Sequence, residues 1–422
     1  MKASKYSAYQ GSSHCIYFQW AVKLNRFCLE IIGLWPESKQ TSWEKNMCNL
    51  RTFLALSTIT LALIPSAHSL IRIYSDVLLL MDNLQYTLVM IICALKIIFF
   101  WWKKTGIGAN TIIYINITNN TDFFCHSDNR YDCGRLDKIK TSQERKIMIT
   151  RAQTARIIIT ISYVFMTAAA SFAIGLSIFG YTMRYVTNIT DPGRLLPLQT
   201  YYIYDVTKSP QYEIAFTTQV AALFMCAMPY IAVDNFLSLS IFHISSQLDI
   251  LNNRLMHLKV ITNYNSVLKS YVKDHTRLLR AIAIIEDTFS ALFLIIFIIF
   301  GTLCICFGFF ITNMFEDGYH VSLSQMAYII TVVMNLIGHM CMYCALGEFL
   351  TAQCDQIHYA VYSNEWYNMD PKNARSLILL LVRTNKPLHL SAGKVFPLTM
   401  VTFCDLLKTV AGYISVLLTI KT

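Results

Sequence analysis

The sequence predicts an all-α membrane protein with seven transmembrane helices, a cytoplasmic N-terminus and an extracellular C-terminus. Three observations predict this fold class. First, 55% of the 422 residues are apolar and only 14% are charged, whereas about 25% of the residues are charged in soluble domains. Second, seven separate apolar runs have the roughly 20 residues that a helix needs to cross a bilayer. Third, positive charge is concentrated on one side of the predicted membrane.

The N-terminal part of the chain, residues 1–49, is mixed in character and is expected to be cytoplasmic. Apolar side chains flank Lys23, Arg26 and Glu30, which predicts an amphipathic helix lying at the membrane interface. Spanning helices are then expected at 50–72, 77–102, 156–183, 216–242, 287–312, 322–348 and 396–420. The predicted organisation is therefore a six-helix unit at 50–348, a cytoplasmic segment at 349–395 and a seventh helix within 396–422.

The cytoplasmic segment contains a short helix of its own. Asp370 and Pro371 suit an N-cap and a first helical position, and Pro387 ends the helical pattern. About 15 residues are too few to span a bilayer. The apolar face of this helix needs a partner, which is either the rest of the chain or another subunit.

Positive charge sets the predicted orientation. The N-terminal segment and the loops 103–155, 243–285 and 349–395 hold 26 Lys and Arg residues, against 5 on the other side. Because positive charge marks the cytoplasmic side, this topology is opposite to that of G-protein-coupled receptors. A seven-helix receptor that signals through G proteins remains the alternative interpretation. Asn188, in the sequon Asn188-Ile189-Thr190, is on the predicted outer side and is the expected glycosylation site.

The seventh helix has one polar face. At about 100° per residue, five small or polar side chains share this face with Val416; they are Asp405, Lys408, Thr409, Gly412 and Thr419. Polar groups at membrane depth require water or protein partners. The face therefore lines a pore or forms a helix–helix interface, and in a pore Val416 would be a hydrophobic constriction.

Enzyme chemistry is not expected. The sequence has no glycine-rich phosphate loop, nucleophile elbow or convincing pair of catalytic carboxylates, so no catalytic residue, cofactor or metal is predicted. The net charge of +10 is explained by cytoplasmic loops rather than by nucleic acid binding. Lys96, Asp234 and His339 fall inside predicted spans. These three residues are expected to pair or to extend toward the interface, and they are assigned no functional role.

The C-terminal 60 or so residues resemble the signature of insect odorant receptors. The segments that match are Asn364-Glu365-Trp366-Tyr367, Ala392 to Thr399, Thr402-Phe403 and Leu407-Lys408-Thr409. The resemblance implies an odorant-gated, non-selective cation channel, tetrameric and lined by the last helix, in the plasma membrane of an olfactory sensory neuron dendrite. It also implies a heterotetramer in which a tuning subunit joins a shared coreceptor.

The resemblance further implies which residues form the sites. Tyr413 and Val416 match the gate positions, Gly412 lies on the same face, and Thr419 stands where the coreceptor has Gln. Because the loop from Met256 to Arg280 is short, the chain resembles a tuning subunit rather than the coreceptor. Small volatile odorants are expected in the outer half of the bundle, where the candidate contacts are Tyr86, Thr87, Phe172, Gln219, Met225 and Tyr328.

Overall fold

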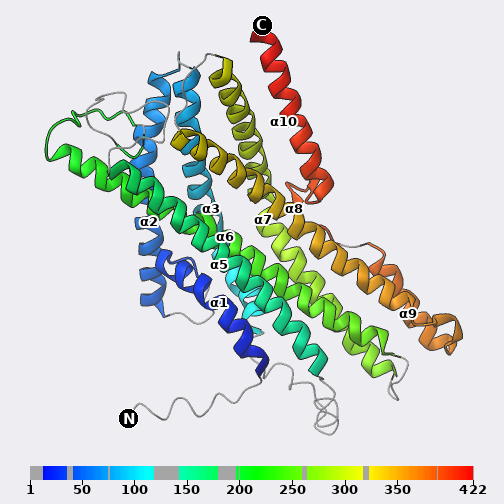
Figure 1. Ribbon diagram of the computed structural model, residues 1–422. Helices are drawn as coiled ribbons and strands as arrows, with labels where there is room; N and C mark the ends of the chain where they lie inside the picture. Colours follow the sequence, from blue (N-terminus) through cyan, green and yellow to red (C-terminus); the bar gives the residue numbers. More distant parts are fainter. Residues whose placement is uncertain are drawn as a thin grey trace, which may run out of the picture.

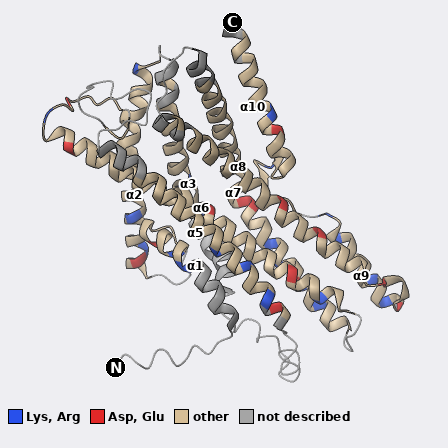
Figure 2. Cartoon of the chain, viewed as in Figure 1, with Lys and Arg blue, Asp and Glu red and all other residues tan. Residues whose placement is uncertain are grey.

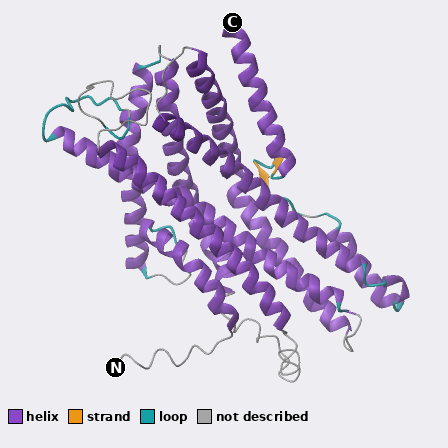
Figure 3. Cartoon of the chain, in the orientation of Figure 1, coloured by secondary structure: helices purple, strands orange, loops and turns teal. Residues whose placement is uncertain are grey.

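A computed structural model describes residues 13–35, 41–74, 77–117, 142–178, 196–198, 200–258, 264–316, 323–386 and 388–421 (Figure 1). Helices account for nearly all of this part of the chain (Figure 3). The helices are α1 (Ser13–Ile32), α2 (Ser42–Arg72), α3 (Val77–Ile117), α5 (Ser142–Ile178), α6 (Gln211–Met256), α7 (Tyr264–Glu316), α8 (Leu323–Tyr362), the 3-10 helix η3 (Trp366–Asn368), α9 (Pro371–Thr384) and α10 (Met400–Lys421).

The seven-helix architecture is confirmed. Within the described residues, six helices are long and apolar enough to cross a membrane, namely α2, α3, α5, α6, α7 and α8. The seventh, α10, has 22 residues, which is about the length that a bilayer requires. The first helix, α1, and the C-terminal end of α10 lie at opposite ends of the bundle, as an odd number of spans demands (Figure 1).

Several helices are much longer than the predicted spans. The 46 residues of α6 give a length of about 69 Å at 1.5 Å per residue, more than twice the thickness of the hydrocarbon core. Beyond the apolar run, polar side chains on α6 pair with α5. Arg151 lies 2.9 Å from Asp249, and Arg254 lies 2.9 Å from Glu144. The helical pattern therefore continues past the end of the hydrophobic signal.

Charged residues are found mostly toward one end of the molecule. Most of the coloured residues in Figure 2 lie toward the end where α1 and α9 are found, away from the C-terminal end of α10. By the positive-inside rule this end faces the cytoplasm.

The core of the bundle is built around α6. Every residue from Pro229 to Ser246 is buried, and α6 contacts α1, α2, α3, α5, α7 and α8. A helix that is buried on all sides is the central element of a bundle. At its far end, the Asn364 amide donates to Leu255 O at 3.0 Å, which joins the ends of α8 and α6.

The N-terminal helix α1 packs on the bundle. Asn25, Leu29 and Ile32 are buried against neighbouring helices, whereas Phe27 remains 59% exposed. Tyr163 of α5 donates a hydrogen bond to the Asn25 side chain at 2.7 Å. The amphipathic pattern predicts that α1 lies at the membrane interface. In the structure, one face of α1 packs against α5 and α6.

A two-stranded hairpin precedes α10. Strands β1 (Ser391–Ala392) and β2 (Phe396–Pro397) pair antiparallel, so α10 begins at Met400, four residues later than the expected helix. The hairpin is fixed to α7, because Gly393 N donates to Ser290 O at 2.8 Å and Lys394 N donates to Ser290 Oγ at 3.0 Å. The Asp287 carboxylate, 2.9 Å from Lys394 Nζ, raises the pKa of that lysine.

Helix α9 matches its predicted range. It begins at Pro371 after Asp370, as expected, although the Asp370 side chain makes no capping hydrogen bond. Leu377 and Leu380 are buried, whereas Leu379 and Val382 are 67% and 68% exposed. The apolar face of α9 is thus only partly covered by this chain, which contributes α8, η3 and α7.

Candidate functional site

The last helix, α10, stands at the edge of the bundle and packs against α7 and α8 (Figure 1). Its buried face includes Phe403 and Val410. Gly308 of α7 makes the close approach possible, because a Cβ atom at that position would lie 2.1 Å from Ile414 Cδ1. The backbone amide of Met400, at the start of α10, donates to Glu348 of α8 at 2.7 Å. Glu348 therefore holds the inner end of α10, and α7 packs closely against the helix further along, at Ile414.

The opposite face of α10 is exposed. It carries all seven residues that the sequence analysis placed on the polar face or at the gate: Asp405, Lys408, Thr409, Gly412, Tyr413, Val416 and Thr419. Tyr413 is 56% exposed and Val416 is 54% exposed. Lys408 Nζ lies 3.4 Å from Asp405, an i,i+3 pair at the surface. Within the described chain, no helix buries this face, so it is not an intramolecular packing interface.

The outer loop is attached to two helices. Gln219 of α6 is fully buried, and its side-chain oxygen accepts a hydrogen bond from Leu198 N at 2.8 Å. Its side-chain nitrogen donates to Thr200 Oγ1 at 2.8 Å and to Tyr202 OH at 3.2 Å. On the α2 side, Tyr201 N donates to Pro65 O at 3.2 Å. The Gln219 amide therefore fixes the loop, and its role as a ligand contact stays a prediction.

The other candidate ligand contacts lie on four different helices. Tyr86 and Thr87 are on α3 and Met225 is on α6, where Tyr86 and Met225 pack against the core. The Thr87 hydroxyl donates to the Asn83 side chain at 2.8 Å. Phe172 belongs to α5 and Tyr328 to α8, but their side chains lie outside the described part of the structure, as do Asn188 and the residues around it. These assignments stay predictions.

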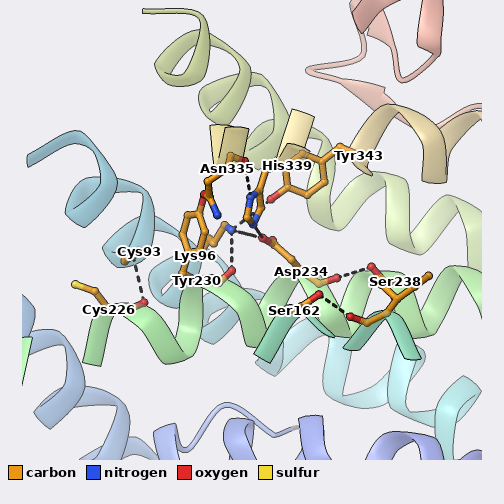
Figure 4. Close-up of polar contacts among 11 residues, drawn as sticks. Cys93, Lys96, Ser162, Cys226, Tyr230, Asp234, Ser238, Asn335, His339 and Tyr343 are labelled. Atoms are coloured by element: carbon orange, nitrogen blue, oxygen red, sulfur yellow. Dashed lines mark hydrogen bonds and ion pairs between the residues drawn. The ribbon is translucent and has the colours of Figure 1, made fainter. Parts of the chain in front are cut away.

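A charged pair lies inside the bundle, where α3, α6 and α8 meet (Figure 4). Lys96 Nζ is 2.8 and 2.7 Å from the two carboxylate oxygens of Asp234. The same ammonium donates to Tyr230 O at 3.0 Å and to Tyr343 OH at 3.3 Å. No part of the Lys96 side chain is exposed. The sequence-based expectation that these charges would pair is confirmed.

Aromatic rings enclose the pair. The Lys96 ammonium lies 4.2 Å from the centre of the Tyr230 ring, a distance typical of cation–π contacts. His339 of α8 adds a second titratable group, with Nε2 3.7 Å from Asp234 Oδ2. Its ring centre is 4.9 Å from that of Tyr230 and 6.5 Å from that of Tyr343. Lys96, Asp234, Tyr230, His339 and Tyr343 are called the ionic cluster below.

Sequence reasoning missed the two tyrosines of the ionic cluster. Tyr230 and Tyr343 have no local signal, since aromatic residues are frequent in every predicted span. The usable signal was indirect: a lysine and an aspartate at membrane depth each require partners, and Tyr230 lies one helical turn before Asp234. The helix pairings that bring α8 to the cluster could not be derived from any single segment.

Comparison with known proteins agrees with this architecture. The profile of the 7tm Odorant receptor family matches residues 76–411. Odorant receptor 10 of Aedes albopictus is 26% identical over 220 residues, which cover 50% of this chain and 57% of that protein. Odorant receptor 85c of Drosophila melanogaster is 21% identical over 341 residues, which cover 80% and 81%. The match to Odorant receptor Or2 of Anopheles gambiae, 24% identical, covers 54% of this chain and 61% of that protein.

Most of these matches thus span between half and two thirds of the curated relatives' own lengths. The fold extends further than the sequence similarity. The solved structure of the insect olfactory receptor OR5 from Machilis hrabei superposes with a TM-score of 0.77 at 15% identity, covering 96% of this chain and 99% of that one. The same receptor in complex with eugenol gives a TM-score of 0.75. With the seven helices and a family profile matching 336 consecutive positions, this multi-pass membrane protein, a receptor rather than an enzyme, belongs to the 7tm Odorant receptor family.

Proposed function

We propose that this chain is the tuning subunit of an odorant-gated, non-selective cation channel, and that it forms a heterotetramer with the odorant receptor coreceptor. The observation that supports this function best is the exposed polar face of α10. Asp405, Lys408 and Thr409 are exposed on a helix that lies against the bundle on its other side. Polar groups at membrane depth need water or protein around them.

A water-filled axis between subunits would meet that requirement. Four chains arranged with their α10 helices inward would place the charged pair near the inner end and Thr419 near the outer end. Val416, 54% exposed on the same face, would then form the narrow apolar ring at which conduction stops by dewetting. Tyr413 would flank this ring, and Gly412, which has open space around its Cα, would keep the path wide beside it.

The helix α9 offers a contact surface for the neighbouring subunit. Leu379 and Val382, together with Ile378 at 39%, leave apolar surface exposed on the cytoplasmic side. Exposed apolar patches commonly mark protein–protein contacts. Because this surface lies outside the membrane, lipid cannot cover it, and a second subunit is the partner that fits the tetramer.

The ligand would be a small volatile molecule held in the outer half of the bundle, among α3, α5, α6 and α8. Aromatic and methionine side chains supply dispersion contacts to such a molecule. Binding there opens the pore only if the odorant has higher affinity for the open state than for the closed one. The plasma membrane of an olfactory sensory neuron dendrite is the location that suits this function.

The experiment that tests the function is a current measurement. Whole-cell current is recorded in heterologous cells given an odorant panel, with and without the coreceptor, while G proteins are blocked. A fast cation current that requires the coreceptor and survives the block is the expected result. A response abolished by the block would support a G-protein-coupled receptor instead and would contradict the channel.

Replacing the constriction tests the pore assignment directly. In a V416S variant, a small hydroxyl replaces the apolar ring, so the barrier to wetting falls and the basal current should rise. The variant V164S is the matched control, because Val164 is also an exposed valine, at 62%, but lies on α5 and not on the polar face of α10. A wild-type basal current in V416S, with the subunit verified in the complex, would contradict the assignment.

A further inference from the structure

The outer loop, which leads into α6, presents a large apolar side chain that the described chain leaves uncovered. Ile203 is 95% exposed, a larger fraction than any other large apolar side chain that the structure describes. Leu198 and Thr200, a few positions earlier, are only 1% exposed. The loop is therefore folded onto the bundle, and Ile203 faces away from it.

Contacts with α2 determine the depth of the outer loop in the membrane. This helix runs outward from Ser42, and between Arg51 and Arg72 it has no Asp, Glu, Lys or Arg, so Arg72 marks the outer membrane surface. Tyr201 N donates to Pro65 O at 3.2 Å. Pro65 precedes Arg72 by seven positions, which is about 10 Å of helix. The loop therefore lies below the outer end of α2, as Figure 3 shows.

Contacts with α6 lead to the same conclusion. The side chain of Gln219 bonds Leu198 N and Thr200 Oγ1, both at 2.8 Å, and donates to Tyr202 OH at 3.2 Å. Gln219 follows Gln211, the first residue of α6, by eight positions, which is about 12 Å of helix. Both helices thus bind the loop well inside their outer ends.

The backbone of the outer loop has the hydrogen bonds that this depth requires. Non-helical backbone at membrane depth is stable only where protein or water satisfies its polar groups. The Tyr201 amide donates to Pro65 O, and the Tyr201 carbonyl accepts from His68 Nδ1 at 3.3 Å. The Leu198 amide donates to the Gln219 side chain. These bonds to α2 and α6 are ones that lipid could not supply.

The side chains of the loop have the character of a membrane interface. The Tyr201 ring centre lies 5.0 Å from that of His68 and 5.2 Å from the guanidinium carbon of Arg72. Tyr204, next to Ile203, is 44% exposed. Tyrosine and arginine favour the interface, because their apolar parts lie in lipid while their polar ends reach the headgroups. Ile203 has no polar end, so the acyl region suits it better than water.

The lipid-facing surface of α2 continues onto the outer loop. Leu61, Ile64 and Ile71 are 60%, 67% and 71% exposed, and at 100° per residue they share one face of α2. His68 lies on the same face and contacts Tyr201. Lipid that covers this face of α2 therefore also reaches the loop, which favours lipid over a protein as the partner of Ile203.

The chain becomes polar directly after this stretch. Lys208 Nζ lies 3.5 Å from Asp205, and the two side chains are 75% and 47% exposed. Thr207 donates to the Asp205 carboxylate through both its amide, at 3.0 Å, and its hydroxyl, at 2.6 Å. A polar turn of this kind belongs in water or among the headgroups, so residues 205–208 mark the return of the chain from the membrane.

We propose that residues 200–204 form a re-entrant segment that inserts Ile203 into the outer leaflet of the membrane, beside α2. The partner is the acyl region of the lipid, and Gln219 and Pro65 hold the segment at this depth. The inference requires that the chain spans a membrane, and it is independent of the proposed channel function.

Fluorescence quenching tests this insertion. The full-length variants I203C and K208C are each labelled with bimane and reconstituted in phosphatidylcholine bilayers. A nitroxide near the top of a lipid acyl chain should quench the label at position 203 more than the label at 208, and aqueous iodide should do the reverse. The emission at 203 should also lie at shorter wavelength. Because the dye is the same, its own affinity for lipid cannot explain a difference, and the unsubstituted chain gives the background from native cysteines.

Two other results would overturn the inference. Iodide quenching at 203 as strong as at 208 would show that Ile203 lies in water. Protection of the label at 203 from both quenchers would show that protein covers Ile203, either a second subunit or another partner. Neither result depends on a measured current, so this inference and the proposed function can fail separately.

A further pair of variants tests how the segment is held. Q219L removes the bonds to Leu198 and Thr200, so iodide quenching at 203 should rise and nitroxide quenching should fall. T217V is the matched control, because the Thr217 hydroxyl bonds only to backbone oxygens within α6, and it should leave both unchanged. Unchanged quenching at 203 in a folded Q219L variant would contradict the role of Gln219. The comparison of positions 203 and 208 needs neither variant.

Discussion

The inner bundle around α6 and the C-terminal helix α10 are held in different ways. A stretch of 18 consecutive residues of α6, Pro229 to Ser246, is buried, and polar bonds link it to α3 and α8 through Lys96 and Asp234. By contrast, α10 packs against two helices and exposes Asp405, Thr409 and Val416. One region is a cross-linked interior, and the other is a helix with a free face.

The difference indicates that the bundle around α6 is rigid and that α10 is the element able to move. Buried, bonded elements open only with a large part of the fold, whereas an element with few buried contacts can move at a lower free-energy cost. The inner end of α10 is held by Glu348 and by the hairpin bound to Ser290. Val416 lies 16 positions beyond Met400 and is 54% exposed, so movement of α10 should be largest toward this outer part of the helix. Three substitutions would break or sharpen this comparison.

The largest effect is expected in the ionic cluster. In K96M, the Asp234 carboxylate would be left without its counter-charge, and breaking a buried ion pair in this way costs about 3–5 kcal/mol. We expect little K96M protein at the cell surface. We also expect no cooperative thermal unfolding transition when the variant is followed by fluorescence-detected size-exclusion chromatography. The ion pair that this variant breaks joins Lys96 Nζ to Asp234 Oδ2 at 2.7 Å.

The double variant K96M/D234L is the control for this prediction. Replacing both charges with apolar side chains of similar volume removes the unpaired charge, and such replacements are often neutral. Surface expression should therefore recover in the double variant. Wild-type expression and thermal stability in K96M alone would show that the buried pair does not stabilise the bundle.

An intermediate effect is expected where α10 touches α7. In G308L, the new side chain would occupy the position of Ile414, because even a Cβ at Gly308 would lie 2.1 Å from Ile414 Cδ1. Overpacking of this kind costs about 1–3 kcal/mol, and here it should push α10 away from α7 and change the basal current.

Two comparisons sharpen the Gly308 experiment. A Cβ atom at Gly338 of α8 would meet no other described atom within 4 Å, so G338L is the matched control and should behave like the wild type. Adding I414A to G308L removes side-chain volume from the other side of the contact and makes room for the introduced side chain. The basal current should then return to the wild-type level. If G308L and G338L have the same basal and odorant-evoked currents, α10 is not seated on α7 in the way described.

The smallest effect is expected on the free face of α10. Asp405 and Lys408 form a pair whose side chains are 63% and 78% exposed, and such pairs contribute no more than about 1 kcal/mol. The thermal stability of D405N should therefore equal that of the wild type. Single-channel conductance should change if this face lines water, because a fixed negative charge has been removed from the path. A clear loss of stability in D405N would indicate that the face is packed after all.

The helices themselves could be predicted from local signals. Apolar runs located the six long apolar helices and α10, and the proline at position 371 marked the start of α9. Two residues in the segments that resemble the odorant receptor signature have structural roles: Asn364 joins α8 to α6, and Gly393, with φ at +64°, lets the hairpin approach Leu294. These roles could not be inferred from the segments, because both partners lie on α6 and α7, more than 90 residues away.

Sequence alone determined the number of spans, their order, the side on which positive charge lies and the polar face of α10, because each of these depends on periodicity and composition within one segment. Tertiary structure decided that Lys96 and Asp234 share a site with Tyr343 and His339, and that Gln219 fixes the outer loop. It also decided that residues 391–397 form a hairpin on α7. Such features depend on groups that only the packing of separate helices brings within bonding distance, and no local pattern specifies that packing.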